Sequence, residues 1–178
     1  GNFIYSTRKQ FLLDFIPEFN HFYEKISKSS EHVELHYESS LNGNTFSSLL
    51  QENLDKDRRL TYTSVGIHKD DLIFKIHDQP LKKFGSQGQQ KSFLIALKLA
   101  KFQFIKNQKG FAPILLLDDI FDKLDNNRVS YLLDLIQSKE LGQTFITDTD
   151  LEKVPAILAS MKIDYKAFEI NNGKTKQL

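Results

Sequence analysis

Two stretches of this sequence carry residue types that suit phosphate chemistry, and about one helix length separates them. Residues 85–90, Gly-Ser-Gln-Gly-Gln-Gln, form a small polar turn that leads into an apolar-periodic run over residues 91–105. This pattern predicts a helix N-terminus, where free backbone N–H groups and the positive end of the dipole favour an anion. Farther along, four aliphatic residues directly precede Asp118 and Asp119. They predict a buried strand that ends in carboxylates, which are ligands that Mg²⁺ prefers.

Each stretch also has an ordinary interpretation. Ser86 could serve only as a helix cap, because a serine hydroxyl accepts a hydrogen bond from a free N–H of the first turn. The aliphatic run could be only a core strand, since acidic residues commonly follow a strand where it leaves the core. The order of both stretches, followed closely by Leu124 and Asp125, is less ordinary. It favours a functional interpretation.

In this order the motifs resemble those of the ABC-type ATPases. The matching residues are Ser86, Gly88 and Gln89 in the Leu-Ser-Gly-Gly-Gln signature, Asp118 and Asp119 in the Walker B pair, and Leu124 with Asp125 in the D-loop. The resemblance implies ATP and Mg²⁺ as cofactors. It also implies a head-to-tail homodimer closed by ATP, because in this superfamily the signature meets the nucleotide of a second subunit.

The resemblance assigns a role to each part of the site. Asp118 would hold Mg²⁺ directly or through water, and Asp119 would orient or deprotonate the attacking water. The hydroxyl of Ser86 and the helix N-terminus would face the γ-phosphate, with Gly88 allowing close backbone approach. Thr147 stands near the place where ABC transporters carry a switch histidine and would sense the γ-phosphate.

A narrower resemblance appears upstream. Residues 66–72, Gly-Ile-His-Lys-Asp-Asp-Leu, look like the Gly-Pro-His-Arg-Asp-Asp-Leu stretch of the RecF family, with departures at Ile67 and Lys69. The resemblance covers essentially the whole chain. It implies a slow, DNA-stimulated ATPase of replication and recombinational gap repair that binds DNA at gaps or single-strand/double-strand junctions. It also implies RecO and RecR as partners, RecA loading and a part in the SOS response.

One family motif is missing from the sequence. RecF chains begin with a P-loop, G-x-x-x-x-G-K-[ST], and the best match here, at Gly173, Lys174 and Thr175, has Phe168 where the first glycine is required. The chain therefore looks like the C-terminal half of such a protein and is expected to be inactive alone. We expect an α/β fold with a parallel sheet, the C-terminal lobe of an ABC-type ATPase head. Residues 60–178 would form this lobe, and residues 1–59 the end of a helical arm.

Two alternatives remain open at this level. The chain could come from another SMC-like or MutS-like ATPase, or it could be an interaction module that keeps the fold without hydrolysis. The intact residues Ser86, Gly88, Asp118 and Asp119 favour an ATPase, because a module without turnover has no reason to keep two acids after an apolar strand.

Composition excludes some classes of protein but does not identify binding partners. The 178 residues are 40% hydrophobic, with fifteen Phe and no Trp, which predicts a Phe-rich core. The net charge of +1 does not indicate whether the chain binds nucleic acid. The lysines of the most basic region are more simply explained as a solvated helix surface than as a DNA-binding patch. They are Lys82, Lys83, Lys91, Lys98, Lys101, Lys106 and Lys109. The absence of cysteine excludes a disulfide scaffold. No apolar run has the length of a membrane span, so we expect a cytoplasmic protein.

The elements around the motifs follow from periodicity. Apolar residues spaced by three and four predict a helix over 7–27, interrupted or bent at Pro17, and alternation predicts a strand over 33–37. A helix is expected after Phe46, a strand over 72–76, a helix over 126–138 capped by Asp125 or Asn126, and a strand over 143–147. A helix over 155–161 and a last strand over 165–170 would complete a parallel sheet. His68, with the acids at positions 70 and 71, more simply predicts a hydrogen-bonded loop than a metal site.

Overall fold

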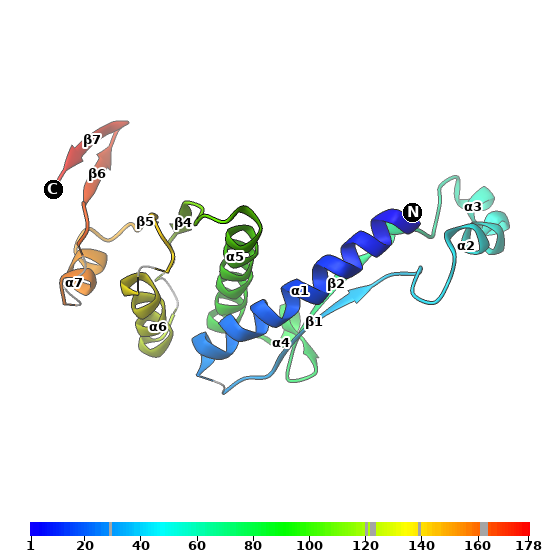
Figure 1. Ribbon diagram of the computed structural model, residues 1–178, viewed down its shortest axis with the longest axis horizontal. Coiled ribbons are helices and arrows are strands. Elements are labelled where there is room, and N and C mark those ends of the chain that lie inside the picture. The colour runs from blue at the N-terminus through cyan, green and yellow to red at the C-terminus, as the bar shows by residue number, and fades with distance from the viewer. Residues whose placement is uncertain (29, 120, 122–123, 139, 161–163) are drawn as a thin grey trace. The chain divides into compact units, whose positions relative to one another are not determined.

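The computed structural model describes residues 1–28, 30–119, 121, 124–138, 140–160 and 164–178 (Figure 1). They form two compact units, Gly1–Lys101 and Phe102–Leu178. Helix α5 (Gln87–Lys109) begins in the first unit and ends in the second. The other elements of the first unit are α1 (Asn2–Ser27), β1 (Val33–Glu38), α2 (Phe46–Glu52), α3 (Leu54–Leu60), the 3-10 helix η1 (Ile67–Lys69), β2 (Asp71–Ile76), β3 (Gln79–Pro80) and α4 (Leu81–Phe84).

Helix α1 is the longest element of the first unit and packs along strand β1 (Figure 1). Its buried face repeats at three and four residues, as predicted, except that Leu12 is buried in place of the predicted Phe11, which is exposed; the buried residues are Leu12, Phe15, Phe19, Phe22, Tyr23 and Ile26. The helix begins at Asn2 rather than near Thr7, because its first turn, with Phe3 exposed, lacks the apolar spacing from which the start was predicted. The predicted interruption is wrong, since α1 continues through Pro17.

Strands β1 and β2 pair antiparallel along their whole length, from Val33 opposite Ile76 to Glu38 opposite Asp71. Both strands were predicted, β1 from the alternation of its residues. The inward residues Val33, Leu35 and Ile76 are buried. The charged run after Leu54 forms its own helix, α3, rather than ending α2.

An aromatic cluster fixes the start of α5 in this unit. The ring of Phe93 lies 4.6 Å from Phe19, 5.1 Å from Phe74 and 5.8 Å from Tyr23, measured between ring centroids. Phe19, Tyr23 and Phe93 are almost fully buried. Burial of each such side chain contributes about 1.5–3 kcal/mol, so the first turns of α5 are firmly held against α1 and β2.

The loop before β2 is organised by one buried carboxylate. The side chain of Asp70 is only 2% exposed and accepts hydrogen bonds from the Arg8 guanidinium, at 2.9 Å, and from the Tyr37 hydroxyl. Arg8 also donates to the carbonyl of Ile67 at 2.8 Å, and Nε2 of His68 lies 3.0 Å from the carbonyl oxygen of Thr63. The hydrogen-bonded interpretation of this loop is confirmed. Across the described ranges, no group of three or more His, Cys, Asp or Glu is placed to hold a metal.

Asp70→Ala is expected to lower the free energy of unfolding by about 1–3 kcal/mol, because Tyr37 and Arg8 lose this acceptor. Burial alone would raise the pKa of Asp70, but hydrogen bonds from Ser39, Tyr37 and Arg8 outweigh it and lower the pKa. The stabilisation is therefore present above the unfolded pKa and is lost as the pH falls through the folded pKa.

Urea denaturation at neutral and acidic pH measures this effect. The exposed neighbour Asp71, whose Oδ1 accepts a local hydrogen bond from the N–H of Leu72, provides the control Asp71→Ala. Equal unfolding midpoints for the two variants at neutral pH would contradict the structural role of Asp70.

The second unit has the predicted α/β order. Its elements after α5 are β4 (Leu115–Asp118), α6 (Asn126–Gln137), β5 (Thr144–Thr147), α7 (Lys153–Ser160), β6 (Phe168–Asn171) and β7 (Lys174–Gln177). Strands β4 and β5 are parallel and in register from Leu115 opposite Thr144 to Asp118 opposite Thr147, with α6 between them in the chain. The α/β fold with a parallel sheet is thus confirmed.

The last predicted strand does not extend the parallel sheet. Instead β6 pairs antiparallel with β7. Asn172 and Gly173 have φ of 49° and 75°, the left-handed values required by a two-residue hairpin turn. This turn returns the chain at once, so β6 pairs with the segment that follows it. Gly173 lies in the turn of this hairpin, and Lys174 and Thr175 lie in strand β7.

The sheet of β4 and β5 is buried on one face only. Leu115 and Leu117 are buried, with other core residues of this unit at Phe121, Leu132, Leu133, Leu141 and Leu158. On the opposite face Leu116 and Phe145 are paired in register and are 66% and 52% exposed. Among the described residues, no helix is both long and apolar enough to cross a membrane.

Candidate functional site

The turn at the start of α5 is a reciprocal capping box. The N–H of Gln89 donates to Oγ of Ser86 at 3.2 Å, and the N–H of Ser86 donates to Oε1 of Gln89 at 2.8 Å. Ser-x-x-Gln is the spacing this motif requires, because the side chain at each end satisfies a backbone donor at the other. Ser86 and Gln87 are exposed, and Gly88 lies in the first turn of the helix. The ordinary role of Ser86 as a cap is therefore present, on a turn whose surface is open to a ligand.

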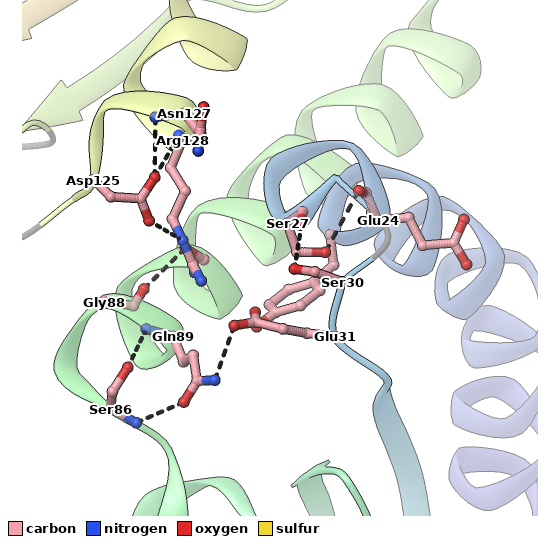
Figure 2. Close-up of polar contacts among 12 residues, drawn as sticks. Glu24, Ser27, Ser30, Glu31, Ser86, Gly88, Gln89, Asp125, Asn127 and Arg128 are labelled. Atoms are coloured by element: carbon pink, nitrogen blue, oxygen red, sulfur yellow. Dashed lines mark hydrogen bonds and ion pairs between the residues drawn. The ribbon is translucent and has the colours of Figure 1, made fainter.

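Gln89 also reaches a residue that sequence analysis missed. Its Nε2 donates to Oε1 of Glu31 at 2.9 Å, and the other oxygen of Glu31 accepts from the Tyr23 hydroxyl at 2.7 Å (Figure 2). The turn is thus attached by a polar link to the segment that follows α1.

The second cluster lies where β4 and β5 end. Because the strands are parallel and in register, their carboxyl ends place Asp118 beside Thr147, and the Thr147 hydroxyl donates to Oδ1 of Asp118. The N–H of Asp119 donates to the carbonyl oxygen of Thr147 at 3.1 Å and lies 3.3 Å from its Oγ1. The three predicted residues are therefore brought together at one edge of the sheet.

Asp118 and Asp119 have different backbone settings. Asp118 is the last residue of β4 and keeps the strand geometry. Asp119 has a φ of 48°, in the left-handed region that non-glycine residues adopt uncommonly and that Asp tolerates better than most. Such conformations occur often at functional sites, where the surrounding structure holds them. Both residues are exposed, so both carboxylates are accessible to a ligand.

Asp125 is the predicted cap of α6. It accepts from the backbone N–H groups of Asn127 and Arg128 at 3.0 and 3.1 Å, and its other oxygen accepts from Nε of Arg128 at 2.8 Å. Burial alone would raise the pKa of Asp125, but these contacts with Arg128 and Asn127 lower it, so the carboxylate stays ionised. Ile120, Asp122 and Lys123, which precede the D-loop motif, lie outside the described residues.

The predicted site residues belong to both units. Ser86, Gly88 and Gln89 lie in the first unit, and Asp118, Asp119, Asp125 and Thr147 lie in the second. The cap at Ser86 was predicted, and the Ser-x-x-Gln spacing is the signal that could also have indicated the role of Gln89 in the capping box. Nothing in the sequence could indicate the contact of Glu31 with Gln89, because 58 positions separate the two residues.

The acidic edge suits Mg²⁺ bound together with a phosphate ligand. Within the part of the chain that the structure describes, there is no cluster of three or more potential metal-ligating His, Cys, Asp or Glu side chains. Mg²⁺ commonly takes one or two carboxylates and completes its octahedron with water and substrate phosphates. Asp118, oriented by Thr147, fits the role of one such ligand, and it would not form a complete metal cage.

Comparison with a known structure defines the fold. No protein-family model matches the chain. A structure described as concerning ATP-driven dimerization and DNA stimulated activation of SMC ATPases is 16% identical, with a TM-score of 0.57 over 97% of this chain and 87% of that one. The fold is therefore similar to that of an SMC ATPase.

Curated relatives of this chain are RecF proteins. The chain is 55% identical over 170 residues to the DNA replication and repair protein RecF of Flavobacterium johnsoniae, which covers 96% of this chain and 47% of the relative. RecF of Bacteroides fragilis is 42% identical over 178 residues, covering 48% of that protein. A solved structure of the recombination mediator protein RecF-ATP in the RecFOR pathway has a TM-score of 0.76 and 26% identity, covering 100% of this chain and 47% of that one. The chain is homologous to RecF, matches its C-terminal half, and spans about half the length of these relatives.

Proposed function

We propose that this chain is the signature and Walker B half of a RecF-like ATPase that dimerises around ATP and acts on DNA. The observation that carries the proposal is the placement of Asp118, Asp119 and Thr147 at one edge of a parallel sheet, in a chain homologous to RecF. A solved relative is described as a RecF-ATP structure, which supports ATP as the ligand of this edge.

The residues of this edge have different roles in phosphoryl transfer. Bound Mg²⁺ would neutralise charge on the phosphates, which is the main requirement of this chemistry. Asp118, which accepts a hydrogen bond from the Thr147 hydroxyl, would be a ligand of that ion. Asp119, one residue later and in a different backbone conformation, orients or deprotonates the attacking water.

The signature turn acts on a second subunit. Ser86 and Gln87 are exposed at a firmly packed helix start, which suits recognition of a γ-phosphate carried by a partner. Two copies arranged head to tail would each supply a signature to the other's nucleotide, so that ATP closes the dimer. Asp125, in the D-loop motif, would lie at the same interface.

The exposed apolar face of the β4–β5 sheet supports contact with a second half of the ATPase head. Leu116 and Phe145 present adjacent apolar side chains to solvent. Burying such a pair is favourable by about 25 cal/mol for each Å² removed from water. We assign this face to contact with the P-loop half of the ATPase head.

The dimer binds DNA. Relatives are named DNA replication and repair proteins, and the solved relative is placed in the RecFOR pathway. We propose binding at gaps and single-strand/double-strand junctions in the cytoplasm, with RecO and RecR as partners in recombination, RecA loading and the SOS response. Exposed lysines on α5, among them Lys98 and Lys101, are available for phosphate contacts.

The direct test uses the RecF-like protein that joins this chain to a P-loop half. Light scattering with and without ATP should show an ATP-dependent dimer, and gapped DNA should stimulate phosphate release. A monomer that binds DNA equally with and without ATP, and that releases no phosphate, would instead support the interaction module without turnover.

Thr147→Val is expected to weaken Mg²⁺-dependent ATP binding about tenfold, the scale of a lost hydrogen bond to a metal ligand. Thr147→Ser keeps the hydroxyl and should bind normally. Thr144→Val, in the same strand, is the matched control, because Oγ1 of Thr144 is buried and has no hydrogen-bond partner in the described structure. Titration of ATP with and without Mg²⁺ checks the effect; equal affinities of the Thr147→Val and Thr144→Val variants would contradict the assignment.

A further inference from the structure

Glu31 connects the buried core of α1 to the turn that begins α5. It follows α1 in the chain, and both of its carboxylate oxygens are engaged: Oε2 by the Tyr23 hydroxyl at 2.7 Å and Oε1 by Nε2 of Gln89 at 2.9 Å (Figure 2). Tyr23 is 0% exposed and packs against Phe93. The carboxylate of Glu31 is therefore fixed from the core side by a residue that has little freedom to move.

Gln89 is fixed at both ends of its side-chain amide. Its Oε1 accepts from the N–H of Ser86, at 2.8 Å, while its Nε2 donates to Glu31. An amide oxygen only accepts and an amide nitrogen only donates, so these two contacts define one orientation of the group. The same residue's backbone N–H donates to the Ser86 hydroxyl oxygen, at 3.2 Å. A shift of Glu31 would therefore be passed directly to the backbone and side chain of Ser86.

We infer that Glu31 is a positioning residue of the signature turn. Its carboxylate sets the Gln89 amide, and that amide sets the backbone around Ser86 which faces the γ-phosphate of a partner subunit. Through Tyr23 the link begins in the core of α1, so the position of this arm helix is coupled to phosphate recognition. This role rests on the proposed function, and it adds a residue outside every motif that resembles the ABC-type ATPases.

The test compares variants of the RecF-like protein in ATP-dependent dimerisation, measured by light scattering, and in ATP affinity, measured with a fluorescent analogue. Glu31→Ala should raise the ATP concentration for half-maximal dimerisation about tenfold, because one positioning contact is lost. ATP affinity of the monomer should not change, since the subunit's own nucleotide rests on its P-loop. Glu31→Gln keeps an acceptor for Gln89 and should behave almost as the unchanged protein does.

A charge exchange keeps the test independent of folding. Gln89→Glu places two carboxylates within hydrogen-bond distance and should impair dimerisation, whereas adding Glu31→Gln restores a donor between them and should recover most of the loss. Glu34→Ala is the matched control, because this half-buried acid contacts the imidazoles of His32 and His36.

The outcomes separate this inference from the proposed function. Ser86→Arg serves as the reference that must block dimerisation if the signature acts on a partner's nucleotide. If Ser86→Arg blocks dimerisation while Glu31→Ala does not, or if Glu31→Gln fails to recover the Gln89→Glu variant, the role of Glu31 is wrong and the proposed function stands. Normal dimerisation of the Ser86→Arg variant would overturn both.

Discussion

Replacing Asp119 by Asn is expected to lower ATP hydrolysis by about two to four powers of ten while ATP and Mg²⁺ binding stay unchanged. Asp119 follows the strand end with its backbone in a left-handed conformation, one residue beyond Asp118, which accepts a hydrogen bond from the Thr147 hydroxyl. Loss of a group that acts on water removes a transition-state contact and leaves the ground state intact. The ATP-bound state should therefore accumulate as a long-lived dimer with prolonged residence on DNA.

Asp118→Asn provides the contrasting result. Asp118 accepts from the Thr147 hydroxyl and is the residue placed to enter the Mg²⁺ shell, so its loss should weaken Mg²⁺-dependent ATP binding as well as turnover. ATP titration with and without Mg²⁺, single-turnover hydrolysis and light scattering distinguish the two variants. If the Asp119 variant loses ATP affinity as severely as the Asp118 variant, or fails to trap a dimer, the two roles are assigned wrongly.

Ser86→Arg is expected to abolish ATP-dependent dimerisation and hydrolysis with little effect on ATP binding by the monomer. Ser86 is exposed at the start of α5, and a long cationic side chain there would occupy the space of the incoming phosphate. Loss of the cap itself costs only about 0.5–2 kcal/mol, which the packed helix start should tolerate.

Ser86→Thr is the matched control, because it keeps both the cap and the hydroxyl. Nucleotide affinity and sedimentation must be measured on the same samples. Loss of ATP binding by the Ser86→Arg variant, with dimerisation unchanged, would show that the turn serves its own subunit and not a partner.

Much of the fold could be predicted because local chemistry and tertiary packing agree. The buried face of α1, the alternation in β1 and the Asp125 cap of α6 all follow from side chains within a few residues of one another. The edge formed by Asp118 and Thr147 was predictable for a related reason: parallel strands bring their carboxyl ends together.

Other features depend on information that lies elsewhere in the chain. The β6–β7 hairpin is set by the Asn172-Gly173 turn, whose preference for left-handed φ outweighs continuation of the parallel sheet. The buried Asp70 requires Arg8, 62 positions away. Glu31 meets Gln89 only because α1 and α5 pack around Phe93. Periodicity identifies the faces of these elements, and it does not identify which polar side chains meet when the faces pack.

The central claim, that the signature of one subunit completes the nucleotide site of another, is tested most directly by mixing inactive variants. Subunits with Ser86→Arg and subunits with a replaced P-loop lysine should each be inactive, yet their mixture should regain ATP hydrolysis, because one site of the mixed dimer keeps every residue. Asp119→Asn mixed with the same P-loop variant should stay inactive, since Asp119 acts on its own subunit's nucleotide. No regained hydrolysis with Ser86→Arg, or equal recovery with Asp119→Asn, would contradict the account.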